Sequence, residues 1–177
     1  MPAKLPSTSE VHWRAFLDSL IKRGLRGVKF IASDDHAGLK AARKAMFAGV
    51  PWQRCQFHLQ HNAQAYVSKL DSRVPVARTI RSIFNAPDIS EANRLLGLAV
   101  EGWRKEHPKL AAWAEENLTE GFAVFALPPE HRVRMRTTNG VERLHKEIKR
   151  KRRVASFFPN GFQGQGQYLP LRSCAPE

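Results

Sequence analysis

The chain has 177 residues, of which 42% are apolar, 25% charged and 9% aromatic. This composition is typical of a folded globular domain and excludes a low-complexity or disordered chain. No run approaches the roughly eighteen apolar residues of a membrane span, and the first ten residues lack the apolar core of a signal peptide, which excludes membrane insertion and secretion as first interpretations. Lys and Arg number 29 against 16 acids, which favours a polyanionic partner. The two distant cysteines, Cys55 and Cys174, suit a reducing compartment, so we predict a cytoplasmic protein.

The first third of the chain alternates helical and extended patterns. Residues 10–23 carry apolar side chains at helical spacing, and Gly24 predicts the end of that helix. Residues 28–33 and 52–57 predict strands, with a helix over residues 37–47 between them. This order implies a parallel α/β layer with ligand groups at the carboxyl ends of its strands, and Asp34 follows one such end.

The middle of the chain predicts a block of helices. Residues 58–84 have the pattern of two helices interrupted near Pro75. Asp88 has the position of an N-cap for a helix that ends before Pro108, and residues 110–118 predict another helix. A final helix is expected over residues 138–153, and the Gly- and Gln-rich residues 161–177 predict a loose tail.

One segment carries most of the positive charge. Residues 132–153 contain ten basic residues and two acids. Such a segment suits a surface that follows DNA or RNA phosphates, because each neutralised phosphate releases condensed counterions. A solvated helix face or a basic tail would have the same composition, and charge alone does not separate these alternatives.

Two small groups of residues could carry chemistry. Asp34 and Glu142 are carboxylates near the basic segment and could bind Mg²⁺ for phosphoryl transfer. Alternatively, Asp34 caps the helix that follows it, and Glu142 stands in a capping box with Asn139. Cys55 and His58 have the spacing of half a zinc site, or else form a buried thiol at a strand end followed by the start of a helix.

Five motifs in order resemble the mutator-type bacterial insertion-sequence transposases over roughly residues 10–160. They are His12-Trp13-Arg14-x-Phe16-Leu17, Gly24-Leu25-x-Gly27-Val28, Ser33-Asp34-x-His36-x-Gly38-Leu39-Lys40, Trp52-Gln53-Arg54-Cys55-Gln56-x-His58 and Arg136-Thr137-Thr138-Asn139-x-x-Glu142-Arg143-Leu144. The resemblance implies an α/β fold: a partial ribonuclease-H-like core with a large, mostly helical insertion, predominantly α by residue count. Transposases of this kind use an Asp-Asp-Glu triad.

The resemblance also assigns roles to residues. Asp34 matches the second Asp of the triad and Glu142 its Glu, so both are expected to bind Mg²⁺ or Mn²⁺ during DNA strand cleavage by water and strand transfer by a DNA 3′ hydroxyl. Cys55 and His58 match a recurrent Cys-x2-His motif, for which we expect a structural role. The cations expected to hold DNA are Arg143, Lys146, Lys149, Arg150, Lys151, Arg152 and Arg153.

The expected organisation is a partial ribonuclease-H-like α/β core (1–57), a helical insertion (58–130), a basic core helix with the Glu (131–160) and a disordered tail outside the resemblance (161–177). The first Asp of the family precedes the matched segment, so a truncated transposase that is inactive alone is predicted. One alternative is a DNA-binding remnant that occupies transposon ends or joins oligomers of intact transposase. Another is a product that does not fold stably, because missing strands leave an unpaired sheet edge.

Overall fold

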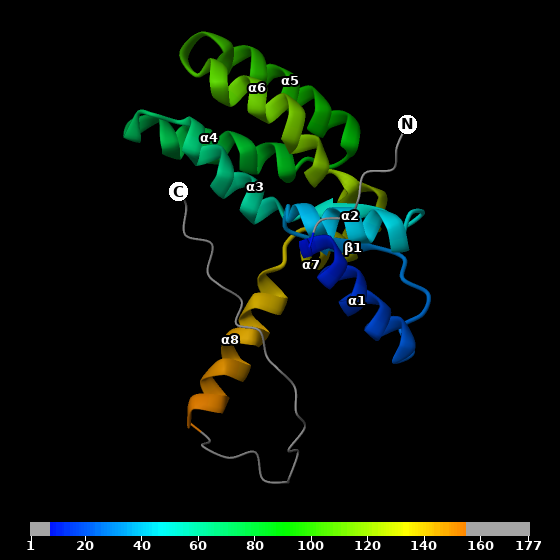
Figure 1. Ribbon diagram of the computed structural model, residues 1–177. Coiled ribbons are helices and arrows are strands. Elements are labelled where there is room, and N and C mark those ends of the chain that lie inside the picture. Colours follow the sequence, from blue (N-terminus) through cyan, green and yellow to red (C-terminus); the bar gives the residue numbers. More distant parts are fainter. Residues whose placement is uncertain (1–7, 155–177) are drawn as a thin grey trace. The chain divides into compact units, whose positions relative to one another are not determined.

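The computed structural model describes residues 8–154, with side chains as far as residue 151, and this part of the chain is mostly helical (Figure 1). The predicted predominance of helix is therefore confirmed. The chain divides into two compact units, Met1–Gly140 and Val141–Glu177. The predicted tail over residues 161–177 lies outside the described residues. The elements are α1 (Thr8–Lys22), β1 (Ile31–Ser33), α2 (Ala37–Met46), β2 (Trp52–Arg54), α3 (Gln56–Ala63), the short 3-10 helix η1 (Gln64–Tyr66), α4 (Leu70–Phe84), α5 (Ile89–Glu106), α6 (Pro108–Asn117), the 3-10 turns η2 (Leu118–Gly121) and η3 (Ala123–Ala126), α7 (Pro129–Met135) and α8 (Asn139–Val154).

Strands β1 and β2 form the parallel pair that the sequence predicts. Ile31 lies opposite Trp52 and Ser33 opposite Arg54. Both strands are shorter than predicted: residues 28–30 have no partner strand in the described chain, and residues 56–57 already belong to α3. A strand needs a hydrogen-bonded neighbour, so a β-rich sequence pattern without one stays irregular.

Helix α1 ends where Gly24 predicts. Gly24 has a φ of +103°, a left-handed conformation that a residue without Cβ adopts at little cost. The amide of Leu25 donates to the carbonyl of Leu20 at 3.0 Å and the amide of Gly24 to that of Ile21 at 2.9 Å. These two bonds form a Schellman motif, which satisfies carbonyls left open at the end of the helix.

Helices α1 and α2 lie against each other at a glycine. A Cβ built on Gly38 would lie 2.5 Å from Ser9 Oγ and 2.8 Å from the Ser9 carbonyl carbon, so only a residue without a side chain allows this approach. Trp13 Nε1 donates to His36 Nδ1 at 3.2 Å at the start of α2. The contact fixes the segment between β1 and α2, which carries the candidate acid.

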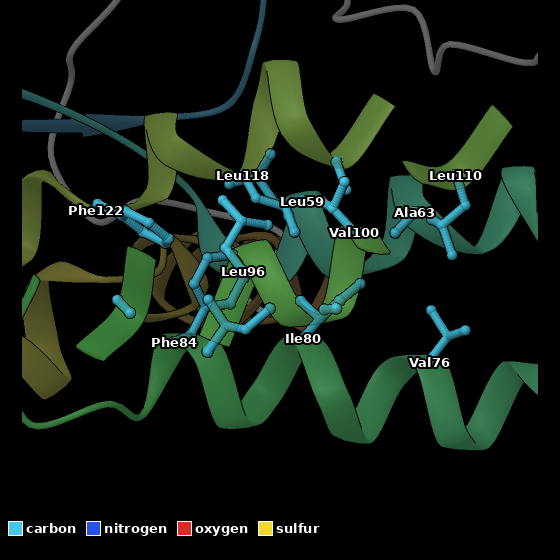
Figure 2. Packing of buried hydrophobic residues seen from close by; sticks show 14 of the residues in the cluster. Leu59, Ala63, Val76, Ile80, Phe84, Leu96, Val100, Leu110, Leu118 and Phe122 are labelled. Atoms are coloured by element: carbon cyan, nitrogen blue, oxygen red, sulfur yellow. The ribbon is translucent and has the colours of Figure 1, made fainter. Parts of the chain in front are cut away.

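The hydrophobic core lies in the helical block from α3 to η3 (Figure 2). Figure 2 shows side chains from these helices directed into one interior. Burial of this apolar surface is the main favourable contribution to folding of the first unit. The core members labelled there are Leu59 and Ala63 of α3, Val76, Ile80 and Phe84 of α4, Leu96 and Val100 of α5, Leu110 of α6, Leu118 of η2, and Phe122.

The predicted interruption near Pro75 is wrong. Pro75 lies inside α4, and the break between the two helices falls at Val67–Lys69, after η1. Pro75 stands in the second turn, where its missing N–H removes one bond to the carbonyl of Asp71. Val76 and Ile80 on the same helix are almost fully buried. Their packing offsets that loss, so the helix continues through the proline.

Candidate functional site

Asp34 lies directly after β1 and is accessible. Its side chain is 53% exposed, and its Oδ1 accepts a hydrogen bond from the amide of Asp35 at 2.7 Å. His58 Nδ1 lies 3.9 Å from the same oxygen. The N-cap of α2 is His36, whose Nδ1 accepts from the amide of Leu39 at 3.4 Å. The interpretation of Asp34 as the cap of that helix is therefore wrong. Its half-exposed carboxylate makes no capping contact to α2 and is accessible to a ligand.

Asp35, the neighbouring acid, has a different environment. Its carboxylate contacts Arg54 Nη2 at 3.1 Å and Lys40 Nζ at 3.5 Å. Glu120 of η2 contacts the same two cations, Lys40 at 2.6 Å and Arg54 at 3.0 Å. Arg54 is only 4% exposed and also donates to Asn117 Oδ1 at 2.9 Å. Two cations thus neutralise Asp35, and the network connects the strand end to the helical block.

Trp52 completes this cationic cluster. Lys40 Nζ and the Arg43 guanidinium each lie 4.9 Å from the centre of its rings, within the range of a cation–π contact. Burial lowers the pKa of Arg43 below its ordinary value, and the nearby Glu120 carboxylate opposes this shift. Trp52 Nε1 donates to Ser33 Oγ at 2.8 Å, which connects the two strands through their side chains.

Cys55 follows β2 at the same edge of the sheet and is fully buried. The amide and the hydroxyl of Thr138 lie 3.4 and 3.5 Å from its sulfur and donate to it. The amide of Gln56 donates to the carbonyl of Arg136 at 2.9 Å. The chain segment just before α8 therefore returns to the strand ends. Among the described residues no group of three or more His, Cys, Asp or Glu side chains could hold a metal ion.

Glu142 lies in the first turn of α8. It belongs to the second unit, Val141–Glu177, whereas Asp34 belongs to the first. The cations of this helix that the structure describes are exposed, and Arg150 forms an ion pair with Glu147 at 3.0 Å. The side chains of Arg152 and Arg153 lie outside the described residues. The exposed cations are Arg143, Lys146, Lys149, Arg150 and Lys151.

The basic segment predicted over residues 132–153 does not behave as one surface. Arg132 donates to the backbone carbonyls of Leu127, Pro87 and Phe125 at 2.8, 2.7 and 3.1 Å, so it fastens α7 to the helical block. Arg136 Nη1 donates to Asn85 Oδ1 at 2.7 Å. Part of the positive charge of this segment therefore has a structural role that composition does not reveal.

Comparison with known proteins gives the class of this chain. Residues 4–163 match the family described as Transposase, Mutator family. The chain therefore belongs to the Mutator family of transposases. Relatives include the transposase for insertion sequence element IS406 of Burkholderia multivorans, 58% identical over 87% of this chain, and that for ISRM5 of Rhizobium meliloti, 35% identical over 84%. The transposase for IS256 in transposon Tn4001 of Staphylococcus aureus is 31% identical over 86%. The chain spans 40%, 37% and 39% of their lengths.

No helix in the described part of the chain has both the length and the apolar character needed to cross a membrane.

Proposed function

We propose that this chain serves in DNA transposition. The reactions are metal-dependent DNA strand cleavage and strand transfer at insertion-sequence ends. The observation that carries the proposal is membership of the Mutator family over residues 4–163, with relatives that are insertion-sequence transposases. The parallel strand pair and its flanking helices are consistent with part of a ribonuclease-H-like core over residues 1–57. Residues 58–130 then form the helical insertion, and residues 131–160 the segment with the second acid.

Asp34 and Glu142 are the proposed ligands of Mg²⁺ or Mn²⁺. Carboxylate oxygens are the donors that these hard cations prefer, so the residue types fit the metal. When bound, the metal would polarise the scissile phosphate and activate the attacking water or hydroxyl. Asp34 is half-exposed at a strand end, whereas Asp35 is held by two cations, which favours Asp34 as the ligand. His58 Nδ1 lies 3.9 Å from the Asp34 carboxylate, which is too far for a direct hydrogen bond.

The exposed cations of α8 are proposed to bind the DNA backbone. They form a run of positive charge on α8 that starts directly after Glu142, and phosphate contacts of this kind position DNA without reading its sequence. Arg152 and Arg153 extend the same run in the sequence. Cys55 is proposed to be structural, because its buried sulfur accepts two hydrogen bonds from Thr138.

We further propose that the chain alone has little or no cleavage activity. Asp34 and Glu142 are two carboxylates, and a two-metal displacement needs a more complete set of ligands. The second candidate function is a DNA-binding protein without catalysis, which inhibits intact transposase by occupying element ends or by joining its oligomers. The accessible basic face of α8 favours this candidate.

Mn²⁺ titration of the purified chain, followed by calorimetry, tests the metal ligands. We expect much weaker Mn²⁺ binding in Asp34→Asn and Glu142→Gln and a smaller loss in the neighbouring variant Asp35→Asn, whose carboxylate is already paired with Lys40 and Arg54. Equal binding by Asp34→Asn and the unmodified chain would refute the ligand assignment.

Plasmid nicking in Mg²⁺ or Mn²⁺, with DNA binding at two salt concentrations, separates the two functions. Nicking that disappears in Asp34→Asn supports the enzyme and overturns the proposed inactivity of the chain alone. Salt-sensitive binding without nicking supports the DNA-binding candidate, and the absence of both refutes the proposed function.

A further inference from the structure

One face of α4 carries positive charge that the function proposed above does not use. Arg73, Arg78 and Arg81 are exposed, and within residues 8–151 none of them has a carboxylate partner within 4.0 Å. Other surface arginines differ in this respect, since Arg94 and Arg104 form ion pairs with acids three residues away on α5. Uncompensated cations repel one another in the free protein, so such a cluster favours an anionic partner.

Two adjoining hollows follow this face. The first has a volume of about 410 Å³ and is lined by Gln64, Arg73, Val74, Ala77, Arg78 and Arg81. Gln64 Nε2 is buried there without a hydrogen-bond acceptor within residues 8–151. Arg73 and Arg81 are eight residues apart, about 12 Å along the helix, or about three to four nucleotides at ~3.4 Å rise. The hollow thus offers three guanidinium groups over the length of a short stretch of DNA backbone.

The second hollow shares Arg81 with the first and has a volume of about 180 Å³. Its other lining residues include Gln60, Asn85 and Arg136, which add amide groups and a fourth guanidinium. Phe57, also in the lining, is 50% exposed. An exposed aromatic ring beside a positively charged groove is the arrangement with which proteins hold unpaired nucleotides, because any base can stack on the ring.

We propose that this face of α3 and α4 is a second DNA-binding surface, distinct from α8, which holds a strand with unpaired nucleotides. Arg73, Arg78 and Arg81 bind its phosphates, and Phe57 stacks on an unpaired base. The inference rests on the proposed function, since it takes DNA as the partner. Guanidinium groups suit phosphate better than lysine does, because their planar donors bind two oxygens at once.

The test compares two variants of the full chain that lose the same charge. One is the triple variant Arg73→Ala, Arg78→Ala, Arg81→Ala. The control is Arg94→Ala, Arg104→Ala, Lys105→Ala on α5. Binding of a fluorescent duplex with an unpaired stretch is measured between low and moderate salt. The α4 triple is expected to bind at least tenfold more weakly, with a salt slope smaller by about 2, since each lost phosphate contact contributes roughly 0.7–0.9.

Phe57→Leu tests the stacking contact. We expect at least a fivefold loss of affinity for the DNA with the unpaired stretch and a smaller loss for the fully paired duplex, because only an unpaired base can stack on the ring. An equal loss for both DNAs would overturn the assignment of unpaired nucleotides. Thermal melting of each variant confirms that the fold is retained.

The outcomes separate this inference from the proposed function. Equal weakening by both triple variants would mean that only net charge matters, and it would overturn the surface on α4. A third variant removes charge from α8: Lys146→Ala, Lys149→Ala, Lys151→Ala. If this variant loses DNA binding while the α4 triple binds normally, the surface on α4 is overturned and the proposed function is supported. Failure of the unmodified chain to bind DNA at low salt would overturn both.

Discussion

Replacement of Arg54 by Met is the sharpest test of how the strand ends are held. The substitution keeps most of the side-chain stem and removes the contacts to Asn117, Glu120 and Asp35 at 2.9, 3.0 and 3.1 Å. Breaking one side of a buried ion pair costs about 3–5 kcal/mol. Asp35 and Glu120 remain 32% and 27% exposed and keep Lys40 as a partner, so part of this cost is recovered by hydration. We therefore expect a loss of about 2–3 kcal/mol in the free energy of unfolding.

Urea unfolding followed by tryptophan fluorescence measures this loss. All four tryptophans lie in the first unit, so the signal reports on that unit and excludes α8. Trp52 stacks against Lys40 and Arg43 and senses the network directly. The melting temperature should fall by roughly 5–10 °C, because about 1 kcal/mol corresponds to 2–4 °C in a chain of this size.

The matched control is Arg94→Met, which removes an exposed pair with Glu91 and should leave the unfolding midpoint unchanged. A double-mutant cycle of Arg54→Met with Glu120→Gln should give a coupling of about 1–2 kcal/mol, since the two side chains share one network. An effect of Arg54→Met below about 0.5 kcal/mol would refute the reasoning, because it would mean that the network contributes no net stability.

Two further predictions concern stability and use the same unfolding assay. Gly121→Ala should lower the free energy of unfolding by about 1–3 kcal/mol, because its Cβ would lie 2.9 Å from atoms of both Leu59 and Phe84. Gly97→Ala on α5, where a Cβ meets open space, should instead raise it by up to about 1 kcal/mol. A change of the same sign in both variants would contradict this reasoning. Asp88→Ala should cost about 1 kcal/mol through loss of the N-cap bond of 2.9 Å, while Asp88→Asn should restore most of it.

Local signals in the sequence predicted many of the elements. The stop at Gly24, the N-cap at Asp88 and the end of α5 before Pro108 are each determined by residues within a few positions, and all three are confirmed. Glu91, three residues after this N-cap, does not complete a capping box with Asp88. The carboxylate of Glu91 accepts two hydrogen bonds from Arg94, which lower the pKa of Glu91, rather than reaching back to the cap.

Features that depend on distant residues could not be predicted in this way. The length of β1 depends on how far its partner strand extends, and the helix through Pro75 depends on the packing of Val76 and Ile80. Neither is visible in a local pattern. The same applies to Gly121, whose carbonyl accepts bonds at 2.8 Å from the side chains of Gln53 and Gln56, more than sixty residues earlier in the chain.

The candidate site was predictable in its residue types but not in its surroundings. Asp34 could be singled out because it follows a strand and matches the family motif, yet no local pattern shows how its surroundings differ from those of the adjacent Asp35. That distinction requires Arg54 and Lys40, whose positions follow from the fold. The metal-binding roles of Asp34 and Glu142 stay predictions.

The contacts of Arg54 and Glu120 connect the helical block that follows the strands to the surroundings of Asp34. Glu120 stands at the end of this block and contacts the same two cations as Asp35, the residue after Asp34. A shift of η2 would therefore release the charges that hold Asp35 and alter the field at its neighbour. Because charges at the strand end respond to one another over a few ångströms, the helical block acts on the Asp34 carboxylate through Arg54 without touching it. On this reasoning, Arg54→Met should strengthen Mn²⁺ binding while it lowers stability, because it removes a positive charge near Asp34, whereas Gly121→Ala should affect stability first.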